Sequence, residues 1–214
     1  MKIGQLFNVS GKVAVVTGGS RGIGEMISAG FLANGVKVYI TARKEEPLIK
    51  KAKELSNEYN GTCIPIACDL SSSLGIDYFV KMIHEKEKAI DFLINNAGAA
   101  WGQPYDEFSE VGWDKVMDLN VKSLFFLTQK LTEILKVRAS GDDPSRVINI
   151  GSIDGLNVPA FETYSYSTSK AAVHHLTRVM AAKLVKENIL VNAIAPGPYP
   201  SQMLGSAAVS YTHL

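Results

Sequence analysis

Tyr166 and Lys170 lie four residues apart in a segment with the length and composition of a helix. Four residues are about one helical turn, so the two side chains share one face. A phenol has an ordinary pKa of about 10, and a neighbouring ammonium group lowers that pKa. The pair therefore predicts a general acid, Tyr166, whose pKa is tuned by Lys170. The spacing alone is weak evidence, so the surrounding sequence decides its meaning.

A second tyrosine and two adjacent histidines lie close to this pair. Tyr164 is six residues before Lys170, which places it on another helical face, so we expect it to line the substrate pocket or to start the helix. The side chains of His174 and His175 diverge by about 100° on a helix, and no other ligand set lies nearby in sequence. We expect these histidines to serve packing, and we expect no metal site.

A glycine-rich turn follows the first predicted strand, where residues 17–24 have the sequence TGGSRGIG. Glycines allow a tight turn and a close approach of the backbone to a ligand. The N-terminus of the helix that follows offers N–H groups and the positive end of a dipole to a pyrophosphate. Turns of this kind also serve packing alone, and the spacing differs from the general dinucleotide fingerprint. With a strand before it and a helix after it, the turn favours nucleotide binding.

The residues after the second predicted strand bear on the choice of nucleotide. NAD-dependent dehydrogenases usually place a carboxylate there to bind the ribose 2′-hydroxyl. This chain has Arg43 and Lys44 instead, and its first carboxylate is Glu45. Arg43, together with Arg21 in the glycine-rich turn, could pair with a 2′-phosphate. We therefore expect NADP, and the alternative is a solvated Arg-Lys pair that opens a helix.

The elements that must position these residues alternate between strands and helices. Strands rich in Val and Ile are predicted at 12–17, 36–41, 62–67, 91–94, 146–150 and 189–195. Helices are predicted at 22–34, 45–59, 71–88, 106–138 and 164–187. Strands that are apolar throughout indicate burial on both faces. The pattern predicts a single α/β domain over 1–214, with a Rossmann-like doubly wound parallel sheet and helices on both faces.

Composition excludes several other classes of protein. The 214 residues are 46% hydrophobic and 20% charged with a net charge of +1, so we expect no nucleic acid or membrane partner. The sequence has neither an apolar run long enough to span a membrane nor a secretory signal, which favours the cytoplasm. Cys63 and Cys68 are five residues apart across a predicted strand and point to opposite faces, so we expect free thiols.

Together, these motifs resemble those of the short-chain dehydrogenase/reductase family over nearly the whole chain. Within that family the chain is most similar to 3-oxoacyl-thioester reductases, including the branch linked to rhamnolipid synthesis. The matching pieces come in the family's order. They are Thr17–Gly24, Asp69-Leu70, Asn95-Asn96-Ala97-Gly98, Asn120, Ser152, Tyr166 with Lys170, and Pro196-Gly197.

The resemblance implies four catalytic residues: Asn120, Ser152, Tyr166 and Lys170. Tyr166 would give its proton to a ketone oxygen, and Ser152 would hydrogen-bond the developing oxyanion. Lys170 would hold the nicotinamide ribose and lower the pKa of Tyr166. Asn120 would position a water that links the lysine to bulk solvent. In isolation, Ser152 could equally be a turn cap and Asn120 a helix-interior residue that bonds backbone.

The resemblance also implies a binding surface for NADP. Asp69 would accept a hydrogen bond from the adenine amino group, although Asp69 could also simply cap a helix. The expected cofactor-binding residues are Gly18, Ser20, Arg21, Gly22, Ile23, Gly24, Arg43, Asp69, Leu70, Asn96, Ala97, Gly98, Tyr166, Lys170, Pro196 and Gly197.

The expected activity is reduction of a ketone, most simply a 3-oxoacyl thioester, in a family that forms homodimers or homotetramers. The alternatives are dehydrogenation of another alcohol (a sugar, polyol or steroid) and an inactive nucleotide-binding fragment. Family members usually continue after Pro196-Gly197 with a substrate loop, a strand and a helix. Here residues 205–214 match none of these, so we expect a truncated frame or a foreign tail, with the last strand and helix missing.

Overall fold

The computed structural model describes residues 7–198 and contains one parallel sheet. Its strand order is β3-β2-β1-β4-β5-β6, and every neighbouring pair is parallel. The strands are β1 (Val13–Thr17), β2 (Lys37–Ala42), β3 (Cys63–Ala67), β4 (Phe92–Asn95), β5 (Ser145–Ile150) and β6 (Ile189–Ile194). This is the predicted doubly wound sheet, with each strand within two residues of its expected bounds.

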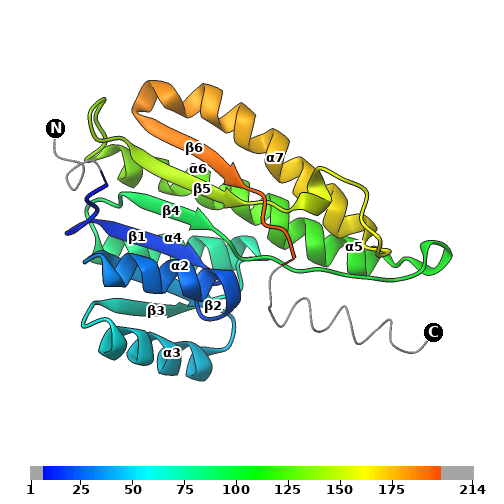
Figure 1. The fold of residues 1–214 in the computed structure, drawn as a ribbon, viewed down its shortest axis with the longest axis horizontal. Coiled ribbons are helices and arrows are strands. Elements are labelled where there is room, and N and C mark those ends of the chain that lie inside the picture. The colour runs from blue at the N-terminus through cyan, green and yellow to red at the C-terminus, as the bar shows by residue number, and fades with distance from the viewer. Residues whose placement is uncertain (1–6, 199–214) are drawn as a thin grey trace.

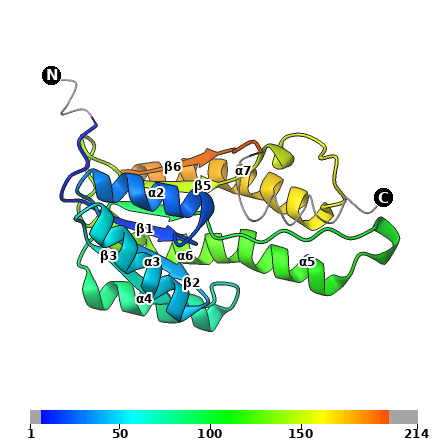
Figure 2. The ribbon, with the colours of Figure 1, turned by 60° about the horizontal axis from the view of Figure 1, so that its bottom comes forward.

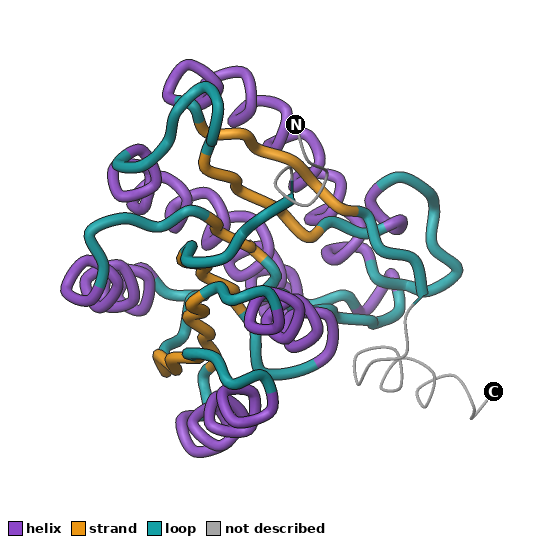
Figure 3. Tube along the Cα trace, turned by 60° about the vertical axis from the view of Figure 1, so that its left-hand side comes forward, coloured by secondary structure: helices purple, strands orange, loops and turns teal. Residues whose placement is uncertain are grey.

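Helices cover both faces of the sheet (Figure 1 and Figure 2). Helices α2 and α3 pack on one face, and α4, α6 and α7 pack on the other. Figure 3 shows the strands enclosed between the helices. The helices are α2 (Gly22–Ala33), α3 (Glu45–Glu58), α4 (Ser73–Lys86), α5 (Glu110–Met117), α6 (Ser123–Lys136) and α7 (Tyr164–Leu184).

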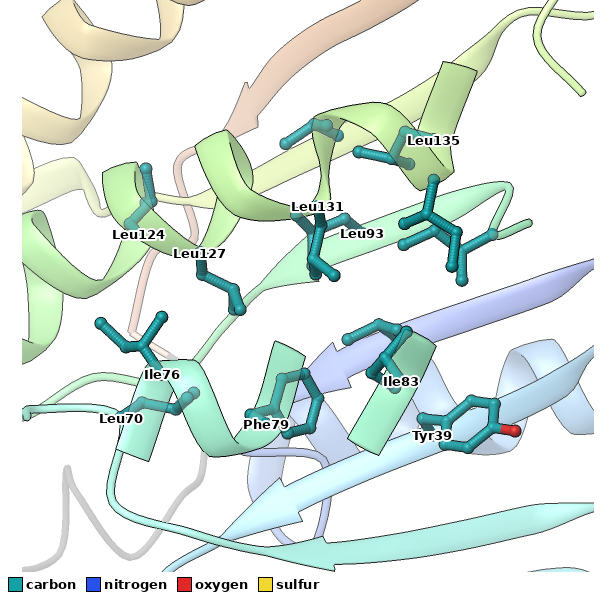
Figure 4. Close-up of a cluster of buried hydrophobic side chains, with 14 of the residues drawn as sticks. Tyr39, Leu70, Ile76, Phe79, Ile83, Leu93, Leu124, Leu127, Leu131 and Leu135 are labelled. Atoms are coloured by element: carbon teal, nitrogen blue, oxygen red, sulfur yellow. The ribbon is translucent and has the colours of Figure 1, made fainter. Parts of the chain in front are cut away.

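The core is divided between these two faces because successive strand residues point in opposite directions. In β1, Val13 and Val15 pack toward α4 and α6, whereas Ala14 and Val16 pack toward α2 and α3. Side chains of α4 and α6 meet on the face of the sheet opposite α2 and α3, where Phe79 and Leu127 are at most 1% exposed (Figure 4). Burial on both faces explains why the strands are apolar throughout.

The carboxyl ends of all the strands lie at one edge of the sheet (Figure 1). The chain winds from β1 outward to β3 and then returns to place β4 on the other side of β1. The strand order therefore reverses between β1 and β4, and open α/β sheets bind ligands outside the carboxyl ends of the strands at such a point. The topology therefore brings the glycine-rich turn after β1 beside the segment after β4.

The long helix predicted at 106–138 is interrupted, which corrects the sequence-based expectation. A 3₁₀ turn, η1 (Tyr105–Glu107), comes first, and a π-helical turn, η2 (Asp118–Lys122), separates α5 from α6. In this turn the Ser123 N–H donates to the carbonyl of Asp118. Single π-helical turns occur frequently at functional sites. This one contains Asn120.

The two cysteines behave as predicted. Both are free, and Cys63 packs with the α2 and α3 face while Cys68 packs with the opposite face. Burial raises the pKa of Cys63 to about 12 and also raises that of Cys68.

β6 is an edge strand of the sheet in the described range, with Ile194 49% exposed. The tail predicted at 205–214 lies outside the described residues.

Candidate active site

The glycine-rich turn adopts a conformation that requires glycine at two positions. Gly18 has a φ of +64° and Gly22 a φ of +56°, the left-handed region that other residues rarely adopt. The turn leads into α2, whose N-cap residue is Arg21, and no side chain caps this helix. Its first N–H groups are therefore available to an anion. Ser20 and Ile23 are partly exposed in the same turn.

The segment after β4 is bound directly to this turn. The Asn96 side chain donates to the carbonyls of Thr17 (2.9 Å) and Gly18 (3.2 Å). The Thr17 hydroxyl in turn accepts from the backbone N–H groups of Asn96 and Ala97, each at 2.9 Å. Asn96 thus secures the central strands, while Ala97 and Gly98, which follow it, are partly exposed. Contact of any of these residues with a nucleotide stays a prediction.

We predict that Gly24→Ala damages both folding and nucleotide binding. A Cβ at Gly24 would overlap the Gly18 carbonyl and the Asn96 side chain, so the turn would have to move. Overpacking of this kind costs about 1–3 kcal/mol, and we expect NADPH affinity to fall at least about tenfold. Gly30→Ala is the matched control, because Gly30 lies on the same helix and a Cβ there would meet nothing within 4 Å. Urea unfolding and NADPH titration measure both effects, and equal behaviour of the two variants would contradict the prediction.

The carboxyl ends of β2 and β3 carry the residues expected at the adenosine. Arg43 is exposed after β2 and has no hydrogen bond or ion pair with any residue in the range 7–198. Asp69 is exposed after β3 and accepts from the N–H and hydroxyl of Ser71. Leu70 is buried in the core. Asp69 is not the cap of α4, because the Ser72 hydroxyl accepts from the Gly75 N–H instead.

Three of the four expected catalytic residues converge at the ends of α7 and β5. Ser152 follows β5, and its hydroxyl accepts from the Asp154 N–H at 3.1 Å and also lowers the pKa of the Tyr166 phenol. Ser152 is therefore both a turn cap and a partner of Tyr166. The ammonium of Lys170 donates to the Ile150 carbonyl at 2.7 Å and lies 5.6 Å from the centre of the Tyr166 ring.

The electrostatics of the pair differ from the sequence-based expectation. Burial raises the pKa of Tyr166, Asp154 raises it further, and the hydrogen bond from Ser152 lowers it. The net shift of the Tyr166 pKa is upward, so in the ligand-free chain burial outweighs the lowering expected from Lys170. Burial also lowers the pKa of Lys170 itself to about 8. Sequence spacing indicated the proximity of the two groups but not the desolvation that dominates both.

Asn120 connects the π-helical turn to the catalytic helix. Its side-chain oxygen accepts from the Ala99 N–H at 2.8 Å, and its side-chain nitrogen donates to the Ala99 carbonyl and to Ser169, both at 2.9 Å. The Ser169 hydroxyl donates to the Tyr166 carbonyl at 2.7 Å. Ser169 thus links the Asn120 side chain to the backbone of Tyr166 by two hydrogen bonds. Its predicted role in positioning a water stays a prediction.

The residues after β6 complete this edge of the sheet. The Pro196 carbonyl accepts from the Ile153 N–H at 3.1 Å, which places the end of β6 beside the turn that follows Ser152. Gly197 is exposed and has open space where a side chain would be. Contact of Pro196 or Gly197 with a nicotinamide stays a prediction.

Tyr164 is the first residue of α7, as one of its two predicted roles requires. Its hydroxyl donates to Glu162 at 2.9 Å, and its ring packs edge-on against Tyr105 and Phe108, each at 5.5 Å. The loop after β4 also bonds to this region, because the Gln103 N–H donates to the Glu162 carbonyl. Aromatic side chains therefore gather where α7 begins.

His174 is a residue whose part in the site the sequence did not reveal. It lies one turn after Lys170, and its Nε2 is 3.0 Å from the Ser152 carbonyl, whereas His175 faces Arg178. The only sequence signal was its position four residues after Lys170.

No group of three or more potential metal ligands occurs among residues 7–198. None of the helices in that range is long and apolar enough to span a bilayer.

Comparisons with known proteins agree with this geometry. A family model described as short chain dehydrogenase matches residues 12–210. The chain is 45% identical over 197 residues to a rhamnolipids biosynthesis 3-oxoacyl-[acyl-carrier-protein] reductase of Pseudomonas aeruginosa, covering 92% of this chain and 76% of that protein. It is 36% identical over 198 residues to a 2-dehydro-3-deoxy-D-gluconate 5-dehydrogenase of Dickeya dadantii, covering 89% and 73%. A solved active-site complex of Pseudomonas aeruginosa RhlG with NADP superposes with a TM-score of 0.91 at 44% identity, covering 95% and 79%.

Proposed function

The chain belongs to the short chain dehydrogenase family, and on that premise we propose that it is an NADP(H)-dependent reductase of 3-oxoacyl thioesters. The product would be the secondary alcohol. The observation that carries the proposal is the buried ammonium of Lys170, 5.6 Å from the centre of the Tyr166 ring, together with the buried Ser152 whose hydroxyl lowers the pKa of Tyr166. This group lies at the same edge of the sheet as the glycine-rich turn.

The residues present fit NADP. The uncapped N-terminus of α2 and the left-handed Gly18 and Gly22 suit a pyrophosphate, and the exposed Arg43 suits a 2′-phosphate. When bound, NADPH supplies a hydride to the ketone carbon. Asp69, Asn96, Ala97, Gly98, Pro196 and Gly197 lie along the same carboxyl edge and would complete the binding surface.

Protein groups supply the proton and stabilise the charge. Burial raises the pKa of Tyr166, so its phenol is protonated at neutral pH and can give its proton to the ketone oxygen. The Ser152 hydroxyl can donate to the same oxygen as negative charge develops. The Lys170 ammonium, 5.6 Å from the ring centre, then stabilises the phenolate that is left. Asn120 holds this helix in place through Ser169.

An acyl substrate agrees with the aromatic side chains near the start of α7. Tyr105, Phe108 and Tyr164 form a chain of edge-to-face contacts there, and Phe108 also packs against Trp113. Aromatic rings offer an apolar surface against which an alkyl chain can pack. The second candidate is a sugar-acid dehydrogenase, which the 36% identical relative from Dickeya dadantii favours.

The test is NADPH consumption with acetoacetyl thioester, compared with NADH and with a panel of sugar ketones. The proposal predicts turnover of the thioester with NADPH, followed as loss of NADPH absorbance. Turnover of sugar ketones alone would favour the second candidate. Tight NADPH binding without turnover of any substrate would indicate a nucleotide-binding protein that does not catalyse reduction.

We predict that Arg43→Ala discriminates between the two nicotinamide cofactors. Loss of a charge-assisted hydrogen bond costs about 1.5–3 kcal/mol, so the Kd for NADPH should rise by about 10- to 100-fold. The Kd for NADH should change little, because NADH has no 2′-phosphate. Lys44→Ala is the control at the neighbouring exposed cation. Equal losses for both cofactors in Arg43→Ala would remove the argument for a 2′-phosphate site.

A further inference from the structure

One stripe of α7 carries four polar side chains that bond to the end of β5 and the turn after it. They recur at the spacing of one helical face. The four are Tyr166, Lys170, His174 and Thr177, and their partners lie within residues 149–152. Tyr166 and Lys170 belong to the proposed chemistry, and Thr177 bonds the buried side chain of Asn149. His174 has no assigned part.

The imidazole of His174 is bound to the backbone of Ser152. Its Nε2 is 3.0 Å from the Ser152 carbonyl oxygen and 3.5 Å from the Ser152 nitrogen. A nitrogen and a carbonyl oxygen at 3.0 Å need a proton between them, so the shorter contact favours the tautomer in which Nε2–H donates. In either tautomer, the ring is tied to the peptide of Ser152.

The orientation of that peptide sets the position of the Ser152 hydroxyl. The hydroxyl meets the Tyr166 phenol and the Asp154 N–H, and the Ser152 carbonyl also accepts from the Gly155 N–H at 3.1 Å. Ser152 is extended, with φ −164° and ψ 155°, and is only 7% exposed. A shift of its backbone would therefore move the hydroxyl away from Tyr166 and disturb the turn that follows.

The residue before Ser152 is shaped to receive the imidazole. A Cβ at Gly151 would overlap two ring atoms of His174, Cε1 and Nε2, at distances closer than real Cβ contacts come. The ring thus packs against the backbone at Gly151 and bonds to the next residue. A side chain that served only packing would fill the space beside Gly151, whereas His174 fills that space and also hydrogen-bonds the Ser152 backbone.

We propose that His174 is a positioning residue that fixes the Ser152 backbone, so that the Ser152 hydroxyl meets Tyr166 and the substrate oxygen. The inference rests on the proposed function, because Ser152 and Tyr166 act together only there. His174 acts through Ser152 and is not itself a proton donor to the substrate. Its role requires a hydrogen-bonding group at the tip of the side chain and not merely a side chain of similar size.

Two variants separate hydrogen bonding from packing. Leucine at position 174 keeps apolar volume against Gly151 but has no donor, whereas glutamine can place an amide near the former Nε2. In His174→Leu, hydrogen exchange should accelerate about tenfold or more at Asp154 and Gly155, whose N–H groups bond Ser152. In His174→Gln, exchange should stay near that of the unchanged protein. Exchange mass spectrometry measures this without any substrate.

Turnover supplies the second readout. In His174→Leu we expect kcat with NADPH and acetoacetyl thioester to fall by roughly 10- to 100-fold, because a small misplacement of a reacting group is costly. The Kd for NADPH should be unchanged, and His174→Gln should recover most of kcat. The inference is overturned if His174→Leu has the same hydrogen exchange and kcat as the protein with histidine. It is also overturned if both quantities are as impaired in His174→Gln as in His174→Leu. If the protein without substitutions shows no turnover, that result counts against the proposed function only. The comparison of hydrogen exchange still decides the role of His174.

Discussion

Tyr166→Phe is expected to lower kcat by about 10³-fold while leaving NADPH affinity nearly unchanged. The phenol lies beside the Lys170 ammonium, and the Ser152 hydroxyl lowers its pKa. Phenylalanine keeps the ring and its packing beside Lys170 but cannot give a proton to the ketone oxygen. Steady-state turnover of acetoacetyl thioester and NADPH titration measure the two quantities separately.

Tyr164→Phe is the matched control for this prediction. The Tyr164 hydroxyl donates to the exposed Glu162, and its ring contacts with Tyr105 and Phe108 survive the loss of the hydroxyl. We expect kcat within about threefold of the unchanged protein, since the lost bond is solvent-accessible and contributes little. Activity that disappears in Tyr164→Phe and persists in Tyr166→Phe would show that the general acid had been assigned to the wrong tyrosine.

The sheet and most of the site could be predicted because their determinants are local. Apolar runs between turn residues defined the strands, and the order of the strand-to-helix turns placed Gly18, Asn96, Ser152 and Tyr166 at one edge. Parallel strands connected by helices must end at the same side, so residues that follow them gather there. The chain topology accounts for this convergence without any long-range contact being known.

The π-helical turn at Asn120 could not be read from the sequence in the same way. Residues 110–136 have continuous helical periodicity, and the Asn120 side chain breaks it by bonding Ala99 and Ser169, which are far away in the sequence. Tertiary contacts of this kind override local propensity. The same limit applies to His174, whose partner Ser152 is 22 residues away.

The pKa of Tyr166 was mispredicted for an electrostatic reason. Spacing revealed a lysine one turn away, but the sign of the shift depends on how much water each group loses on folding. Burial raises the pKa of Tyr166, and Asp154, which no motif singled out, raises it further. Burial therefore keeps the Tyr166 phenol protonated at neutral pH in the ligand-free chain.

The burial of Lys170 also has a thermodynamic consequence. Lys170 is 5% exposed, and burial lowers its pKa from 10.5 to about 8. At pH 7 the ammonium is still charged in the folded chain, so it destabilises folding by about 3 kcal/mol relative to water. This cost is net of the hydrogen bond to the Ile150 carbonyl, so the buried charge is retained against stability.

Lys170→Met should therefore inactivate the protein and stabilise it. We expect kcat to fall by about 10²-fold or more, because no cation remains beside the phenolate. We also expect the free energy of unfolding at pH 7 to rise by about 2 kcal/mol, since a buried charge is replaced by an apolar side chain. Urea unfolding gives the second value. Lys183→Met, at an exposed lysine of the same helix, should change it by no more than about 0.5 kcal/mol.

The pH dependence of this stabilisation identifies its cause. Because the pKa of Lys170 is lower in the folded chain, the unfolded chain binds more protons between about pH 8 and 10.5. The unfolding free energy of the unchanged protein should therefore rise across that interval relative to Lys170→Met. The advantage of the methionine variant should be full below about pH 8 and nearly gone at pH 10.5. A methionine variant that is less stable at every pH would show that the ammonium is well solvated or fully compensated in the folded chain.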